Sequence, residues 1–304
     1  MHSDYEILKN RIKLIEDAIK MSIENNLQNT PNLFETNLGD AIMYAISLHD
    51  HRISSFLLLE SASLFGVEED KAVKVAMVLE ILHTCRKLTG ALISDDLSNY
   101  QHYKIGHFFR KYDTTTAILV TLGLLHHCYS ILVDPDLHHF AAIRIDLVNR
   151  FAKSAGILGL IAGQMMTIEY KAKELHLDQI ARLQRMKIGS LFALSCELGA
   201  SLGEAPPLLI NNLSCFGNNI GIAFQINHDL LKKNYMNYQV PNTNLISKIG
   251  EEEAKAHANM LAMQAKEYLS LFDIRATNHL KLFVDYLISI DDKGTEMQSL
   301  FTAE

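Results

Sequence analysis

The stretch FQINHDLLKKN, residues 224–234, places an acid, an imidazole and an amine close together in a helical pattern. Asp229 supplies a carboxylate, the kind of hard oxygen ligand that Mg²⁺ prefers. His228 is a poor ligand for that ion. Lys232 follows His228 by four residues, which puts both on one helix face. The stretch therefore has one candidate metal ligand, and it carries its own cation beside that ligand.

The stretch LEILHTCRKLTGALISDDLSNYQHYKIG, residues 79–106, holds a second set of polar residues. Asp95 and Asp96 are adjacent acids, and Asn99 adds a neutral oxygen that can also bind Mg²⁺. The pair is interpreted equally well as metal ligands or as a loop or helix-end pair. His83 is interpreted either as a buried core histidine or as a phosphate-binding residue.

Two apolar stretches each carry a polar residue that needs an explanation. GLIAGQMMTIE, residues 159–169, contains Gln164, and RMKIGSLFALSCELGA, residues 185–200, contains Lys187. Burying an ammonium group without a partner is costly, so a lysine beside Gly189 in an apolar helix is expected to face a polar cavity. Gln164 is interpreted either as a satisfied core amide or as a ligand-binding residue.

These residues must be positioned by helices. The chain of 304 residues is 48% hydrophobic with only 15 Gly and 5 Pro, and apolar residues recur with helical periodicity. We find no strand-like alternation longer than about four residues. The pattern predicts helices at 3–28, 34–49, 52–66, 69–92, 113–132, 137–171, 176–203, 207–234, 250–271 and 275–290. The expected fold class is therefore all-α.

Several of the expected helices are apolar on more than one face, which is typical of the centre of a helical bundle. No linker or change in composition divides the chain, so we expect one domain over 1–304. Within it, residues 1–30 are an N-terminal helix and 291–304 a frayed tail.

Charge and cysteine usage exclude several kinds of partner. The net charge is −7 with acids and bases mixed, so no basic surface predicts nucleic-acid binding. The N-terminal stretch lacks the apolar region of a secretory signal, and the longest apolar runs are too short to span a bilayer. Cys85, Cys128, Cys196 and Cys215 are widely spaced, as buried free thiols in a reducing compartment are. We therefore expect a cytoplasmic protein without a membrane span.

Taken in order, the four polar stretches resemble the trans-isoprenyl diphosphate synthases, the farnesyl and geranylgeranyl type of polyprenyl synthetase. Glu80 and His83 match the family's E-x-x-H, and Gly163 with Gln164 matches its G-Q pair. Lys187 to Gly189 matches K-T-G, and Phe224 with Gln225 begins the F-Q-x-x-D-D-x-x-D motif. The resemblance covers residues 40–290, nearly the whole chain.

This resemblance implies an isoprenoid-synthase bundle around a central cavity, usually as a homodimer. It implies a reaction in which an allylic diphosphate ionises and the double bond of isopentenyl diphosphate attacks the resulting cation. The family neutralises the leaving diphosphate with Mg²⁺ ions held between two facing Asp-rich motifs. The expected ligand is a prenyl diphosphate or a similar anionic small molecule.

The resemblance also assigns roles to particular residues of this chain. The implied catalytic residues are Asp96, Asp229 and Lys187. The implied diphosphate-binding residues are Arg52, His83, Lys104, Gln164, Gln225 and Lys232. The implied Mg²⁺ ligands are Asp95, Asp96 and Asp229.

The second Asp-rich motif departs from the family pattern. Its three acids align with His228, Asp229 and Lys232, so only the middle acid remains. Lys232 puts a positive charge where the family places a metal ligand. This lysine is expected to take the place of an ion and to let the site bind an anion without metal.

The first Asp-rich motif can be aligned in two ways. Without a gap, its paired aspartates fall on Gly90 and Ala91, and only its last acid survives, as Asp96. Alternatively, residues 95–99 form a displaced D-D-x-x-N, which needs an insertion of five residues after His83 and places Lys104 and Gly106 where the family has R-R-G. We prefer the first alignment because it needs no insertion in a helix that otherwise matches.

Other parts of the family pattern are also altered. The G-G-K-x-x-R segment aligns with residues 49–54, where only Arg52 remains of its basic residues. On the preferred alignment Cys85 and Arg86 occupy positions that line the pocket for the prenyl tail. A guanidinium facing an apolar tail would be costly to bury.

The leading hypothesis is an isoprenyl diphosphate synthase-type protein whose Mg²⁺ motifs are depleted, weak or inactive as a transferase. Such a protein could serve as a non-catalytic subunit with a heteromeric partner. The first alternative is a working short-chain prenyltransferase, or a cyclase-like enzyme, that uses the remaining acids. The second is a helical scaffold with a filled cavity.

Overall fold

A computed structural model describes residues 2–48, 52–93, 104–170, 173–236 and 243–288 of the chain. Regular structure within these residues is helical throughout, and they contain no strand. The all-α prediction is therefore confirmed. The expected frayed tail, 291–304, lies outside the described residues.

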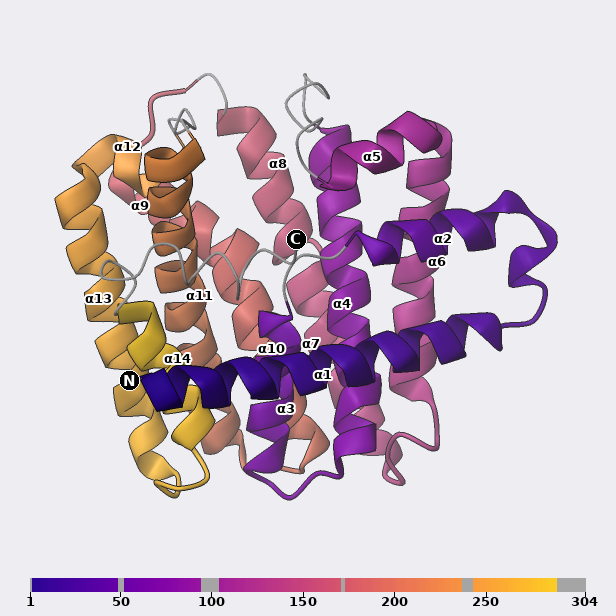
Figure 1. Ribbon diagram of the computed structural model, residues 1–304, viewed down its shortest axis with the longest axis horizontal. Coiled ribbons are helices and arrows are strands. Elements are labelled where there is room, and N and C mark those ends of the chain that lie inside the picture. Colours follow the sequence, from indigo (N-terminus) through magenta and orange to yellow (C-terminus); the bar gives the residue numbers. More distant parts are fainter. Residues whose placement is uncertain (1, 49–51, 94–103, 171–172, 237–242, 289–304) are drawn as a thin grey trace.

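The helices follow the periodic apolar segments of the sequence. They are α1 (His2–Gln28), η1 (Leu33–Glu35), α2 (Asn37–Ser47), α3 (Ile53–Ser63), α4 (Glu69–Leu92), α5 (Lys104–Lys111), α6 (Thr114–Val133), α7 (Ala141–Ala155), α8 (Leu160–Tyr170), α9 (Leu177–Gln184), the π-helical turn η3 (Arg185–Gly189), α10 (Ser190–Leu202), α11 (Pro207–Met236), α12 (Leu245–Ile249), α13 (Glu251–Tyr268), η4 (Leu269–Leu271) and α14 (Asn278–Ile288). The long helices stand side by side, and α1 crosses in front of them (Figure 1).

Helix α10 lies at the centre of the bundle and contacts α3, α7 and α11. Glycines at its contacts allow the backbones to come close. A Cβ atom at Gly199 would lie 2.4 Å from the carbonyl oxygen of Leu58 on α3, and one at Gly217 of α11 would lie 2.4 Å from that of Phe192. The apolar faces expected at the bundle centre are thus packed backbone to backbone.

One expected helix, 137–171, is interrupted. The structure has α7 and α8 there, separated by a turn at 156–159. Gly156 leaves helical geometry at φ −89° and ψ −149°. A Cβ atom at Gly159 would overlap the carbonyl oxygen of Ser154, so the turn depends on glycine at this position. The apolar periodicity continues across the turn, which is why the sequence predicted one helix.

The buried carboxylate of Glu60 on α3 links α1 and α14, the first and last described helices, to the core. Glu60 of α3 is 4% exposed. It accepts a hydrogen bond from Nε of Arg11 on α1 at 2.8 Å, and its other oxygen lies 2.8 Å from Nδ1 of His279 on α14. These two polar partners offset part of the cost of burying the carboxylate.

Helices α6, α7 and α8, together with the turn between α7 and α8, expose a set of large apolar side chains. They adjoin in sequence order, α6 against α7 and α7 against α8. The exposed residues, which we call the α6–α8 apolar face, are Ile118, Leu119, Leu122, Tyr129, Val133, Ile145, Ile157, Leu158, Ile161, Met165 and Ile168. Apolar patches of this kind mark interaction surfaces.

Within the described residues, two helical segments are long and apolar enough to cross a membrane by length and composition alone. They are Thr114–Val133 and Ala141–Tyr170, and 39% and 28% of their most apolar stretches are buried. The second contains the turn between α7 and α8. The sequence-based expectation of no membrane span therefore stays a prediction.

Candidate functional site

Asp229 lies on α11, and the residue is 8% exposed. Its Oδ1 accepts a hydrogen bond from Nε2 of Gln225 at 2.8 Å, one helical turn earlier. Its Oδ2 accepts one from Nδ2 of Asn244 at 2.6 Å. Asn244 also caps α12, because its Oδ1 accepts from the backbone N–H of Ile246. Asp229 therefore joins α11 to the start of α12 through neutral amides.

The residues next to Asp229 are also engaged in packing. The ring of His228 stacks on Phe224 with centroids 5.9 Å apart, and its Nδ1 lies 3.9 Å from Oδ1 of Asp229. Asn227 points to the other side of α11 and donates to the carbonyl oxygen of Leu287 on α14 at 3.0 Å. Lys232 belongs to α11, but its side chain lies outside what the structure describes.

The described donors at this position do not suit a Mg²⁺ ion. That ion needs several oxygen ligands in near-octahedral geometry. Asp229 is one carboxylate whose two oxygens already accept amide hydrogen bonds. Across the described residues there is no group of three or more His, Cys, Asp or Glu side chains that could hold a metal. Asp95 and Asp96 lie outside these residues, so their assignment as ligands stays a prediction.

Lys187 lies on the π-helical turn η3, between α9 and α10. Single π turns inside helices are frequent at functional sites. Its stem passes close to α8, since a Cβ atom at Gly163 would be 3.0 Å from Cγ of Lys187. Burial lowers the pKa of Lys187 from 10.5 to about 8. The charge of Arg86 lowers this pKa as well, while the charge of Asp229 raises it. The predicted inward-facing lysine is thus within electrostatic reach of both residues.

Arg86 comes to this position from α4. Nε2 of Gln164 on α8 donates to the backbone carbonyl of Arg86 at 3.3 Å, which joins α8 to α4 at this residue. The neighbouring Cys85 faces a different way and donates its thiol to the carbonyl of Thr121 on α6 at 3.6 Å. Burial raises the pKa of Cys85 to about 12. Cys85 therefore packs against α6, whereas the charge of Arg86 acts on Lys187.

Arg52 and Glu80 form a buried ion pair. Nη1 of Arg52 lies 2.6 Å from Oε2 of Glu80, and the hydroxyl of Ser55 donates to Oε1. Arg52 is 8% exposed and Glu80 is 1% exposed. The pair joins α4 to the start of α3. His83 lies one turn further along α4 and is half-buried. The diphosphate-binding roles of Arg52 and His83 stay predictions.

Of the predicted site residues whose side chains the structure describes, four lie near one another. Lys187, Gln164, Gln225 and Asp229 converge from η3, α8 and α11. Lys104 begins α5, but its side chain is outside the described part of the chain. Sequence reasoning missed Asn244, and it considered Arg86 only for a tail pocket. An Asx residue just before an apolar pair was the available signal for the cap at Asn244.

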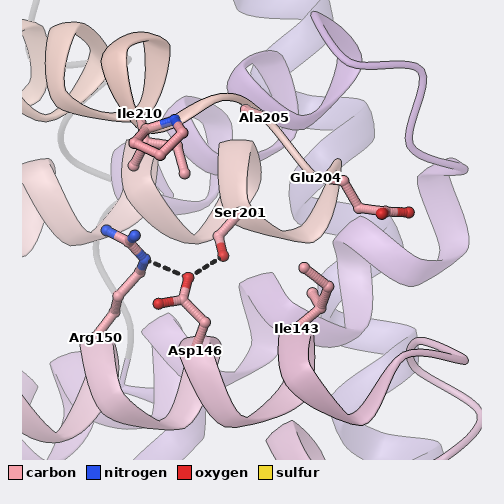
Figure 2. Close-up of a pocket in the computed structure, with 8 residues that line it drawn as sticks. Ile143, Asp146, Arg150, Ser201, Glu204, Ala205 and Ile210 are labelled. Atoms are coloured by element: carbon pink, nitrogen blue, oxygen red, sulfur yellow. Dashed lines mark hydrogen bonds and ion pairs between the residues drawn. The ribbon is translucent and has the colours of Figure 1, made fainter.

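A separate pocket of about 360 Å³ lies at the other end of α11. It is lined by Ile143, Asp146, Arg150, Ser201, Glu204, Ala205, Pro207 and Ile210. Figure 2 shows Asp146 between Arg150 and Ser201; Nε of Arg150 lies 2.7 Å from its Oδ2. Ile210 and Asp229 are separated by roughly 28 Å along the helix, at about 1.5 Å per residue. This pocket is therefore distinct from the residues around Asp229, and the sequence did not point to it.

Comparisons with known proteins agree on one family. The family model described as polyprenyl synthetase matches residues 35–267. The farnesyl diphosphate synthase of Escherichia coli is 26% identical over 86% of this chain and 90% of its own length. The geranylgeranyl diphosphate synthase of Cyanophora paradoxa is 27% identical over 88% and 91%.

Solved structures share the fold. An FPP/GFPP synthase from Zymomonas mobilis superposes with a TM-score of 0.84 at 25% identity, covering 93% of this chain and 99% of its own. A geranyltransferase from Legionella pneumophila has a TM-score of 0.80 at 19% identity, covering 96% and 98%. The all-α bundle expected from the sequence resemblance is therefore the bundle of these synthases.

Proposed function

The chain belongs to the polyprenyl synthetase family, and from that premise we propose that it binds a prenyl diphosphate but is weak or inactive as a chain-elongating transferase. In that role it acts as a single domain, and it serves as a non-catalytic subunit or as a carrier of the anionic ligand. The proposal concerns the chemistry of the site, since the fold is shared with active synthases.

One observation carries this proposal. Both oxygens of Asp229 accept hydrogen bonds from the amides of Gln225 and Asn244. Ionising an allylic diphosphate requires its developing negative charge to be stabilised, and such electrostatic stabilisation is usually the largest catalytic contribution. A single carboxylate already engaged by amides is a poor replacement for a set of Mg²⁺ ligands.

A substrate panel tests the proposal. The protein is incubated with radiolabelled isopentenyl diphosphate and C5, C10 or C15 allylic diphosphates, with and without Mg²⁺. The amount of radiolabel in the elongated product is measured. Binding of each diphosphate is followed in parallel by thermal shift, so that a binding failure is distinguished from a slow reaction. We expect binding with little or no elongated product. Rapid product formation would contradict the proposal.

A second candidate is a working short-chain prenyltransferase. It is favoured by the relatives, because farnesyl and geranylgeranyl diphosphate synthases match most of this chain. In this case Asp95, Asp96 and Asn99 would supply the first set of oxygens and Asp229 the second. The same panel separates the two candidates. If product forms, this candidate requires that Asp229→Ala abolish it.

We also propose that the protein is a homodimer in the cytoplasm, with a second copy covering the α6–α8 apolar face. The face spans three successive helices, and a homodimer contact is more apolar than an ordinary protein surface.

A further inference from the structure

The pocket between α7, α10 and α11 combines an apolar wall with ionisable side chains. Ile143, Asp146 and Arg150 come from one face of α7, at positions i, i+3 and i+7. Ile210, from the first turn of α11, adds to the apolar wall. The pocket volume of about 360 Å³ is in the range of small-molecule sites. The pocket can therefore take a ligand that has both a hydrocarbon part and a charged part.

Among the described residues that line the pocket, Arg150 is the basic one, and it is already paired with acids. Its Nε lies 2.7 Å from Oδ2 of Asp146, and its Nη1 lies 3.3 Å from Oε2 of Glu197 on α10. Ser201 donates its hydroxyl to the same Oδ2 of Asp146. The guanidinium charge is shared between two carboxylates, so Arg150 does not make the pocket attractive to an anion.

Two carboxylates at the pocket keep oxygens for a ligand. No described residue donates a hydrogen bond to Oδ1 of Asp146, because both of its neighbours bind Oδ2. The carboxylate of Glu204 is half-exposed, and the described residues offer it Nε2 of His138 at 3.5 Å. With His138 neutral, the carboxylates of Asp146, Glu197 and Glu204 outnumber the guanidinium by two charges. A ligand with two positive charges would balance this cluster.

Glu204 stands at the pocket although another residue type suits its backbone better. A Schellman motif ends α10, since the N–H of Glu204 bonds to the carbonyl of Ser201 and that of Ala205 to the carbonyl of Ala200. Glycine is usual at the left-handed position of this motif, but Glu204 occupies it with φ 54°. Figure 2 shows the side chain of Ile143 between those of Asp146 and Glu204. An alkyl chain that lies over Ile143 can thus point its two ends at the two carboxylates.

We propose that this pocket binds an aliphatic diamine, with one ammonium group on Oδ1 of Asp146 and the other on the carboxylate of Glu204. Each ammonium group donates charge-assisted hydrogen bonds to its carboxylate. The methylene chain between them packs against Ile143 and Ile210, which removes apolar surface from water. The pocket is distinct from the residues around Asp229 and its ligand is a cation, so this inference goes beyond the proposed function and does not depend on it.

Calorimetry on the full chain tests the proposal with a series of ligands. Diamines with three, four and six methylene groups are titrated separately, and butylamine is the matched ligand with one ammonium group. We expect at least one diamine to bind about tenfold or more tightly than butylamine, because butylamine lacks the second contact with a carboxylate. Equal binding of butylamine and the diamines, or no binding of any diamine, overturns the proposal.

Matched variants locate the two contacts. We expect Asp146→Asn and Glu204→Gln each to weaken binding of the tightest diamine by about 10- to 100-fold, the usual effect of losing a hydrogen bond to a charged group. Asp136→Asn is the control, because it removes an exposed acidic charge just before α7 from a residue that does not line the pocket. Its affinity should stay within about twofold of the wild type if contact, and not general charge, provides binding.

Circular dichroism shows whether each variant is folded. Asp146→Asn loses an ion pair with Arg150, whereas Glu204 is half-exposed, so Glu204→Gln keeps the test decisive if the first variant does not fold. Unchanged affinity of the folded Glu204→Gln protein overturns the proposal. An equal loss of affinity in Asp136→Asn overturns it too.

Competition with Mg²⁺ distinguishes a diamine site from a general cation site. Across the described residues, no group of three or more His, Cys, Asp or Glu side chains could hold a metal. We therefore expect the diamine to remain bound when Mg²⁺ is added at the same concentration. Displacement of the diamine by an equal concentration of Mg²⁺ would show that charge alone is recognised, and it would overturn the proposal.

Discussion

At the scale of single residues, Asp229 has a hydrogen-bonding partner, Asn244, that occupies one of its carboxylate oxygens. The sequence identified it as the surviving acid of a metal-binding pattern. The structure adds that Asn244, fifteen residues later, holds one of its oxygens. A pattern of acids along one helix cannot reveal a partner from the following loop. This is why the sequence predicted the residue but not its hydrogen bonds.

Lys187 gives a residue-scale prediction about pH and stability. Its pKa falls from 10.5 to about 8 on folding, mainly through burial. Between these values the unfolded chain binds more protons at this position than the folded protein, so the stability contribution rises with pH in that window. Below it, the full cost of burying the charge is present. We therefore expect Lys187→Met to raise the Tm near neutral pH, and the gain to shrink as pH rises through about 8.

Thermal unfolding followed by circular dichroism from about pH 7 to 10.5 measures this effect. Lys153→Met is the control, because Lys153 is an exposed residue of α7. Its Tm should follow the wild type at every pH. A lower Tm for Lys187→Met near neutral pH would mean that the charged lysine stabilises the folded protein, the opposite of the expected effect.

At the scale of elements, apolar periodicity predicted most helices to within a few residues. Residues 69–92 were predicted as one helix and form α4. Periodicity failed where a glycine turn interrupts an apolar run, as at 156–159. It also missed α5 and α12, which are only one or two turns long. Such helices contain too few residues to establish a period of 3.6.

The contact between α10 and α11 gives a prediction at this scale. Gly217→Ala places a Cβ atom 2.4 Å from the backbone oxygen of Phe192, and a backbone cannot turn away as a side chain can. We expect a loss of about 1–3 kcal/mol in the free energy of unfolding, the range for overpacked cores. Urea denaturation measures it.

Gly123→Ala is the matched control in α6. A Cβ atom at Gly123 has no neighbour within 4 Å, so the replacement meets no clash. The free energy of unfolding should rise by about 0.5–1 kcal/mol, the cost of glycine inside a helix. If both variants lost the same stability, close approach of α10 and α11 would not be the cause.

At the scale of the whole molecule, the fold was predictable because four polar stretches follow one another along a helical chain in the same order as in the trans-isoprenyl diphosphate synthases. The site was only partly predictable, since Arg86 and Lys187 lie about a hundred residues apart, and α8 contacts the backbone of the first and the side-chain stem of the second. A sequence places residues along elements, but the packing of α8 between α4 and η3 decides which charges act on each other.

The α6–α8 apolar face gives a prediction for the assembly. Leu119→Glu combined with Leu122→Glu places two charges in the proposed homodimer contact, where burying them unpaired is costly. We expect light scattering to give twice the chain mass for the wild type and the chain mass, 34.3 kDa, for this variant.

The control for the assembly is Leu14→Glu, because Leu14 is also exposed but lies on α1. This variant should keep the mass of the wild type. A wild-type protein that is already monomeric, or a dimer that survives both charges, would show that the α6–α8 apolar face is not the contact.

The contacts of Glu60 with Arg11 and His279 affect how well the chain tolerates removal of its terminal segments. Arg11 and His279 reach this carboxylate from opposite ends of the sequence, and both lie beyond residues 35–267, the part that the family model covers. A fragment cut to that part would keep the buried acid and lose both of its basic partners. Proteolysis that removed either Arg11 or His279 would leave Glu60 with one partner fewer, although these two residues lie more than 250 residues apart in sequence.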